Sequence, residues 1–208
     1  MKFDLDTTAA KTIGGHIDSK GAYIGEFVEA WEILSKNGVP GIHLAFKDEK
    51  GQTANNLDVY THSKDGAPLP GYNTINQIMT CLQLRTMSSV DEAIMVFNRE
   101  TKQMEPDRKN VFRDLIGKKI GLVLRCEPYI GKSGPVNAVK IFMPFEAKTR
   151  RSAREVLDGI TDAVDITNIL ADLKDKVLPV PTNTFNLPPQ SENPAFGVSN
   201  DFDSDLPF

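Results

Sequence analysis

Two segments decide the fold: Lys118-Lys-Ile-Gly-Leu-Val-Leu-Arg-Cys126 and Val136-Asn-Ala-Val-Lys-Ile-Phe-Met143. Both are rich in β-branched and aliphatic residues, which favour extended backbone in a half-buried sheet. Between them lies Gly131-Lys-Ser-Gly-Pro135, a composition typical of a tight connection. We therefore expect the two segments to form an antiparallel hairpin.

A second hairpin is predicted nearer the start of the chain. Residues 22–34 are rich in aromatic and β-branched side chains, Asn37-Gly38 is a turn signal, and residues 41–47 alternate between apolar and polar positions. A third strand is expected over residues 55–62, which show the same alternation. The first third of the chain is therefore predicted to be β structure.

Helical signals separate these strands from the later ones. Apolar residues repeat at helical spacing over residues 74–84, behind a capping box formed by Thr74 and Gln77. This helix is expected to plug the sheet. Residues 91–97 are predicted as a further strand, and residues 108–116 as a short helix.

The last third of the chain changes character. Ser152 and Glu155 are placed to cap a short helix, and an apolar stripe with the spacing of a helix face follows over residues 166–177. Over residues 179–208, six of thirty residues are proline and none is basic, so this segment cannot repay the entropy of folding. We predict one domain over residues 1–178, followed by a disordered tail.

Together these elements predict a fold class. Five or six strands with one inserted helix favour a small Greek-key barrel, and the OB-fold is the natural candidate. The expected fold is mainly β, an OB-fold-like β-barrel with a few helices and a disordered C-terminal tail.

Charge is divided unevenly along a chain whose net charge is −4. Residues 107–154 hold 12 basic and 4 acidic residues, an excess of +8, whereas residues 179–208 hold 4 acidic and no basic residues. The excess positive charge can attract phosphate, while the end of the chain repels nucleic acid. This division predicts that the domain binds a nucleic acid.

Binding of a single strand needs cations along the phosphates and aromatic faces on which bases stack. Strand alternation places several such residues on the non-core face, and a dense basic cluster follows the last strand. The predicted DNA-binding residues are Trp31, Lys47, Tyr60, Arg125, Lys140, Phe142, Lys148, Arg150, Arg151 and Arg154. Trp31 and Phe142 have an alternative place in a second small core under the C-terminal helix, and the basic cluster has one as a solvated helix start.

No catalytic or metal-binding pattern is recognised. His16, His43 and His62 lack metal-ligand spacing, and Cys81 and Cys126 are expected to be reduced core residues. The start of the sequence has no export signal, and no apolar run is long enough to span a bilayer. We expect a non-enzymatic protein without cofactor or metal, not associated with a membrane, in the cytoplasm of a bacterial host.

The chain ends in Asp201-Phe-Asp-Ser-Asp-Leu-Pro-Phe208. This octapeptide closely resembles the acidic C-terminal tip of bacterial single-stranded-DNA-binding proteins, with Ser204 and Leu206 in place of the usual Asp and Ile. The resemblance implies that the tip recruits replication and repair enzymes. The Phe208 ring can enter an apolar pocket while the terminal carboxylate meets a basic group at the rim. The predicted partner-binding residues are Asp201, Phe202, Asp203, Asp205, Leu206, Pro207 and Phe208.

A looser resemblance covers more of the chain. It is carried by Gly21-Ala-Tyr23, the hairpin that ends at Lys47, Leu115-Ile-Gly-Lys-Lys-Ile-Gly-Leu122 and the Ser152-Ala-Arg-Glu155 helix. These segments are similar to phage-encoded proteins from recombination gene clusters, some of which bind single strands through an OB-fold. The resemblance implies a phage-encoded single-stranded-DNA-binding protein, and it assigns no DNA contact to a particular residue.

Three hypotheses of function remain open from the sequence. The first is a protein that coats single-stranded DNA in replication, recombination or repair and recruits partners through its tip. The second is an adaptor, or mimic of the host's single-strand binder, that docks on its partners without binding DNA. It gains support from residues 1–178, where 24 basic and 24 acidic residues cancel. The third is a metal-dependent nuclease built from carboxylates that converge in space. The sequence leaves the oligomeric state open, including a homo-oligomer.

Overall fold

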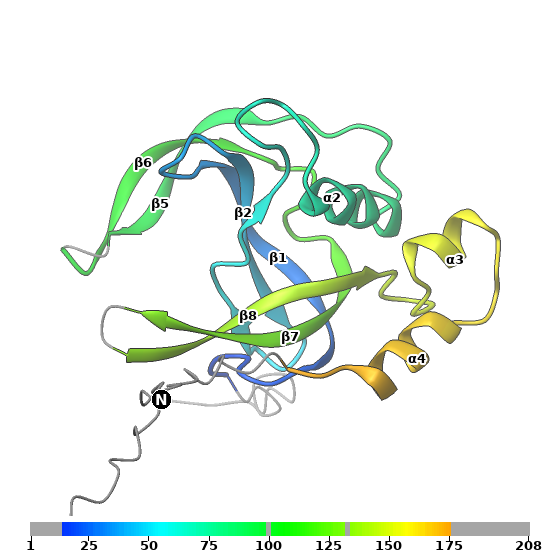
Figure 1. Cartoon of the computed structure of the whole chain (residues 1–208). Coiled ribbons are helices and arrows are strands. Elements are labelled where there is room, and N and C mark those ends of the chain that lie inside the picture. Colours follow the sequence, from blue (N-terminus) through cyan, green and yellow to red (C-terminus); the bar gives the residue numbers. More distant parts are fainter. Residues whose placement is uncertain (1–13, 99–100, 132–133, 176–208) are drawn as a thin grey trace, which may run out of the picture. The chain divides into compact units, whose positions relative to one another are not determined.

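The fold is an antiparallel β-sheet accompanied by short helices, seen in a computed structural model that describes residues 14–98, 101–131 and 134–175 (Figure 1). The strands are β1 (Gly21–Leu34), β2 (Pro40–Asp48), β3 (Thr53–Ala54), β4 (Val59–Tyr60), β5 (Val90–Asn98), β6 (Gln103–Val111), β7 (Lys119–Gly131) and β8 (Gly134–Phe145). The helices are α2 (Pro70–Cys81), α3 (Ala153–Leu157) and α4 (Val164–Asp172). Within this part of the chain, no helix has both the length and the apolar character needed to cross a membrane.

β1 is the centre of the sheet because it pairs along both of its edges. β2 runs antiparallel to it on one edge. On the other edge, β7 pairs with Gly21–Glu26 and β6 meets the strand at Trp31. A register shift between Phe27 and Glu29 bends β1 near the place where its partner changes. β7 also pairs with β8, so both predicted hairpins, β1–β2 and β7–β8, are confirmed.

The barrel is open along one seam. β3 and β4 pair with β2, β8 pairs with β7, and no strand pairing among the described residues joins β8 to β3 or β4. The single strand predicted over residues 55–62 is wrong, because Asn56 adopts a φ of +58° that interrupts extended backbone between β3 and β4. The predicted class is confirmed as a mainly β fold, an antiparallel sheet with a few helices. A partly open barrel is also found in OB-folds, and the OB type stays a prediction.

The barrel core is closed by α2, whose Ile75 and Ile78 are buried in the same cluster as Phe27 and Phe46 of the first hairpin. The predicted plug is therefore confirmed, but its predicted start at Thr74 is wrong. The helix begins at Pro70, since proline lacks the N–H that the first helical turn leaves unpaired. Thr74 lies inside the helix, and its hydroxyl donates to the carbonyl of Pro70.

A second cluster covers the outer face of β7 and β8. Val123 and Phe145 from the hairpin pack against Ile166 and Leu173 from the α4 region. The predicted apolar stripe is thus confirmed as far as Leu173, and its last position, Val177, lies outside the described residues. Cys81 and Cys126 are buried and unpaired, as predicted.

The helix predicted over residues 108–116 is wrong, because residues 103–111 form β6. This strand pairs with β5 in an uninterrupted register from Val90–Val111 to Asn98–Gln103, which outweighs a weak helical pattern. The two strands make an arm that reaches away from the barrel (Figure 1). The predicted tail, residues 179–208, lies outside the described residues.

Candidate nucleic-acid interface

A groove follows the open seam of the barrel. Its wide part, with a volume of about 770 Å³, lies between the segment Thr53–Asp58 and two stretches of the β7–β8 hairpin, Glu127–Tyr129 and Val136–Lys140. A narrower part of about 330 Å³ lies between β4, the start of α2 and β8. Asp58 and Lys140 line both parts, so the two hollows adjoin, and together we call them the seam groove.

Two exposed tyrosines lie along the seam groove. Tyr129 lines the wide part and is 52% exposed, and Tyr60 lines the narrow part and is 38% exposed. Lys140, which lines both parts, forms no ion pair among the described residues. Aromatic faces with a cation between them can stack bases and contact a phosphate. The fold thus brings together two of the predicted residues, Tyr60 and Lys140.

The seam groove is not a strongly positive surface. Its charged lining residues are Asp58, Glu127 and Lys140, which sum to −1. Asn55 and Asn137 add amide groups that both donate and accept hydrogen bonds. Stacking and hydrogen bonds, rather than bulk charge, would therefore carry most of the affinity of this groove for a nucleic acid.

Asp58 is held in the groove wall by a partly buried histidine, His43. Its carboxylate is 2.7 Å from Nδ1 of His43, whose Nε2 is 3.5 Å from the Glu29 carboxylate. Burial alone would lower the pKa of His43, but the hydrogen bonds to Asp58 and Glu29 outweigh it and raise the pKa above 6.5. The His43 ring stacks on Trp31 at 4.3 Å between centroids.

Trp31 supports this wall from behind. It is only 8% exposed, and one face of its ring is occupied by His43. Its stacking on bases stays a prediction, and Trp31 is not a lining residue of the seam groove. Lys47 is exposed on β2, where the strand register sets it opposite Glu26 of β1 and Thr53 of β3. It is not a lining residue of the groove.

Arg125 and Phe142 lie on a different surface, beside α4. The Arg125 guanidinium is 5.0 Å from the centre of the Phe142 ring, and its Nε donates to Glu127 at 2.7 Å. Both residues line a hollow of about 390 Å³ together with Ile169 and Leu173. Phe142 is 40% exposed at the rim of the second core, close to the alternative position predicted for it under the C-terminal helix.

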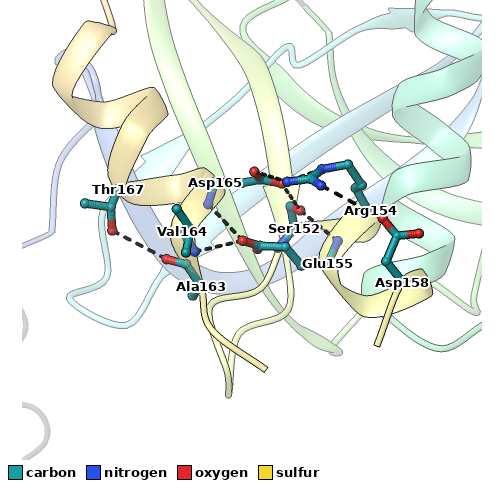
Figure 2. Close-up of polar contacts among 8 residues, drawn as sticks. All are labelled: Ser152, Arg154, Glu155, Asp158, Ala163, Val164, Asp165 and Thr167. Atoms are coloured by element: carbon teal, nitrogen blue, oxygen red, sulfur yellow. Dashed lines mark hydrogen bonds and ion pairs between the residues drawn. The ribbon is translucent and has the colours of Figure 1, made fainter. Parts of the chain in front are cut away.

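The basic cluster after β8 is partly consumed by ion pairs, and Figure 2 shows those of Arg154. Arg154 pairs with Asp165 at 2.5 Å and with Asp158 at 3.9 Å. Arg151 pairs with Glu146 at 3.1 Å and donates to the carbonyl of Ile160. These two arginines therefore hold the chain around α3 and α4.

The centre of this corner is Glu155, which is fully buried (Figure 2). Its carboxylate accepts hydrogen bonds from the backbone N–H groups of Ser152, Val164 and Asp165, while the Ser152 hydroxyl accepts from the N–H of Glu155. The predicted capping box is confirmed, and the same carboxylate also binds the start of α4. Burial would raise the pKa of Glu155, but these backbone donors lower it below 4.5.

The remaining members of the cluster, Lys148 and Arg150, are exposed. The Arg150 guanidinium is 5.5 Å from the centre of the Phe145 ring. Neither residue forms an ion pair among the described residues, so they keep their charge available to a ligand.

Ion pairs disperse the excess charge of residues 107–154. Seven of its basic residues form such pairs: Arg108, Lys109, Arg113, Lys119, Arg125, Arg151 and Arg154. In the described part of this segment, the basic residues without an ion pair are Lys118, Lys140, Lys148 and Arg150. The excess charge counted along this segment is therefore left without an ion pair at only these four described residues.

Sequence reasoning missed Tyr129. The signal was its position two residues before Gly131, the start of the predicted hairpin loop, because loops between barrel strands contribute to ligand sites in OB-folds. The predicted partner-binding residues, Asp201, Phe202, Asp203, Asp205, Leu206, Pro207 and Phe208, lie outside the described residues.

Comparison with known proteins adds no family. No family model matches the chain, and no curated protein matches it. In residues 14–98, 101–131 and 134–175, no group of three or more His, Cys, Asp or Glu side chains is arranged to hold a metal ion.

Proposed function

We propose that this protein binds single-stranded DNA without strong sequence preference through the seam groove, and recruits replication or recombination proteins through its C-terminal tip. It would act in the cytoplasm of a bacterial host, as a phage-encoded single-strand binder. The observation that carries the proposal is a pair of adjoining hollows that share Lys140, one lined by the exposed Tyr60 and the other by the exposed Tyr129.

The groove suits a single strand better than a duplex. Aromatic side chains stack on unpaired bases of any sequence, and each stacked base contributes roughly 1–3 kcal/mol. A duplex keeps its bases stacked on one another, so its bases are not free to stack on Tyr60 or Tyr129. The charged residues that line the groove sum to −1 and favour neither form. The tip supports the second half of the proposal by its sequence alone, since Asp201–Phe208 resembles the recruiting peptide of bacterial single-strand binders.

The experiment is fluorescence anisotropy of a labelled oligonucleotide titrated with the full chain across a salt series. We expect Tyr129→Ala and Tyr60→Ala each to weaken binding about tenfold, which corresponds to the loss of one stacked base. Lys140→Glu is expected to weaken binding and to reduce the slope of log affinity against log salt by about 1.

Matched controls lie outside the groove. Tyr72→Ala removes a tyrosine that is 43% exposed on α2, and Lys64→Glu makes the same charge change in an exposed turn. Both should leave DNA affinity within twofold. Equal losses in these controls, or a preference of the wild-type protein for duplex, would refute the assignment of the groove.

A second candidate is the adaptor that docks on partners of the host's single-strand binder without binding DNA. It is favoured by the ion pairs that neutralise seven basic residues of the 107–154 segment. A competition assay separates the two candidates. The adaptor displaces the host tip peptide from a purified repair enzyme through Phe208, yet shows no anisotropy change with DNA at low salt.

A further inference from the structure

The β5–β6 arm carries an exposed apolar face. Cross-strand pairing sets Phe97 opposite Met104 and Met95 opposite Pro106, so that these four side chains share one face. Met95, Phe97 and Met104 are 53%, 55% and 50% exposed. Aromatic and methionine side chains are enriched at protein interfaces, where charged residues are depleted. This face therefore has the composition of a contact surface.

The arm also has an open edge. β5 ends the strand order of its part of the sheet, and among the described residues it pairs with β6 alone. Its outer edge offers N–H and C=O groups along nine residues that contain neither proline nor lysine, two of the usual protections of an edge strand. Such an edge selects another β-strand as its occupant.

We propose that the occupant is β5 of a second copy of this chain, paired antiparallel about a two-fold axis at Met95. An interface between identical strands related by a two-fold axis is self-complementary by symmetry. In this register Met95 faces Met95, Ala93 faces Phe97, and Ile94 faces Val96. Directly opposite residues share a face, so the apolar faces of the two arms join into one surface across four strands.

The register is selected by side chains. A shift of one residue would set the apolar face of one arm against the opposite face of the other. With the axis at Met95, the small Ala93 lies beside the large Phe97 of the second copy. Like charges are also avoided within residues 92–98. The one charged residue of that stretch, Glu92, faces Asn98 of the second copy.

The contact is independent of the seam groove. No residue of the arm lines that groove, so the failure of one proposal leaves the other intact. Pairing along one nine-residue edge buries less than the roughly 1,600 Å² of a standard interface. We therefore expect an association that depends on protein concentration.

Sedimentation equilibrium of the full chain over a concentration series tests the proposal. The wild-type protein should form dimers, while Met95→Lys and Met95→Glu should each sediment as monomers, because like charges would face each other across the axis. An equimolar mixture of the two variants should restore dimers, since lysine then faces glutamate. A monomeric wild-type protein, or dimers that survive both substitutions, would overturn the proposal.

A cysteine cross-link checks the register. Met95→Cys should form a disulfide between copies under mild oxidation, because opposite residues of paired strands lie within disulfide reach. Leu34→Cys, at a 71% exposed position outside the arm, is the matched control and should stay monomeric on a non-reducing gel. Equal cross-linking at both positions, or none at residue 95, would overturn the placement of the axis.

Discussion

Two hairpins of this fold, β7–β8 and β5–β6, have similar hydrogen bonding but different surroundings. The base of the first is covered on both faces, because Leu122 and Leu124 lie in the barrel core and Val123 lies in the second core beside α4, while Tyr129 near its tip is exposed. In the second, Val111 is buried at the base, while Phe97 is exposed near the tip. Burial rather than hydrogen bonding distinguishes them. We infer that β7–β8 stabilises the fold, whereas β5–β6 offers its surface to a partner.

The largest expected effect comes from the covered hairpin. A Cβ atom at Gly121 would lie 2.0 Å from the Phe145 ring, which is itself fully buried. We expect Gly121→Ala to lower the free energy of unfolding by about 3 kcal/mol, as overpacked cores do. Chemical denaturation followed by circular dichroism measures the loss. A change below about 0.5 kcal/mol would contradict the tight contact of β7 with β8.

The cover of that hairpin depends on Glu155, which holds the start of α4. Glu155→Ala removes the acceptor for three backbone N–H groups, and we expect a loss of roughly 2 kcal/mol. Because the pKa of Glu155 is lowered in the folded state, its contribution is present above pH 4.5 and is lost as the pH falls through the folded pKa. Denaturation of both proteins from pH 3 to pH 7 tests this sign. The difference in the free energy of unfolding between the wild-type protein and Glu155→Ala should shrink towards pH 3.

The contribution of His43, in the barrel wall, to the free energy of unfolding should depend on pH in the opposite direction. The folded pKa of His43 is raised, so its stabilising contribution is complete below pH 6.5 and is lost as the pH rises through the folded pKa. We expect His43→Gln to cost about 1 kcal/mol at pH 5.5 and less at pH 8.5. Arg108→Gln on the arm breaks an ion pair that is more than half exposed, and it serves as a control that changes little with pH.

The smallest expected effect lies on the arm. Phe97→Ala removes a large ring, yet that ring is 55% exposed, so in dilute solution the free energy of unfolding should change by less than about 0.5 kcal/mol. A urea titration at low protein concentration is sufficient. A loss comparable to that of Gly121→Ala would show that the arm is covered by the rest of the chain.

The sequence predicted the elements whose local pattern and tertiary surroundings agree. The strands β1, β2, β7 and β8 and the capping box at Ser152 belong to this class. The start of α2 was missed because Pro70, rather than a side-chain cap, begins the helix. β6 was missed because its own sequence shows no strand alternation, and its extended backbone depends on pairing with β5.

The candidate site was predictable only in part. Alternation identified Tyr60 and Lys140, which the fold brings to one groove. Arg151 and Arg154 were predicted from the density of the basic cluster, and their ion pairs with Glu146 and Asp165 could not be assigned from spacing. The number of basic residues in a segment does not tell which carboxylates will pair with them. The exposure of Tyr129 could not be predicted either, because it depends on where its loop lies in the barrel.

The open seam has a mechanical consequence. Among the described residues no ladder hydrogen bond crosses it, so its two lips can separate without breaking any backbone pairing between β8 and the β3–β4 segment. The clearance between Tyr60 and β8 is then set by side-chain contacts, including those of α2, rather than by a strand ladder. A purine and a pyrimidine differ in width, and under the proposed function a groove bounded in this way would accept both with little discrimination.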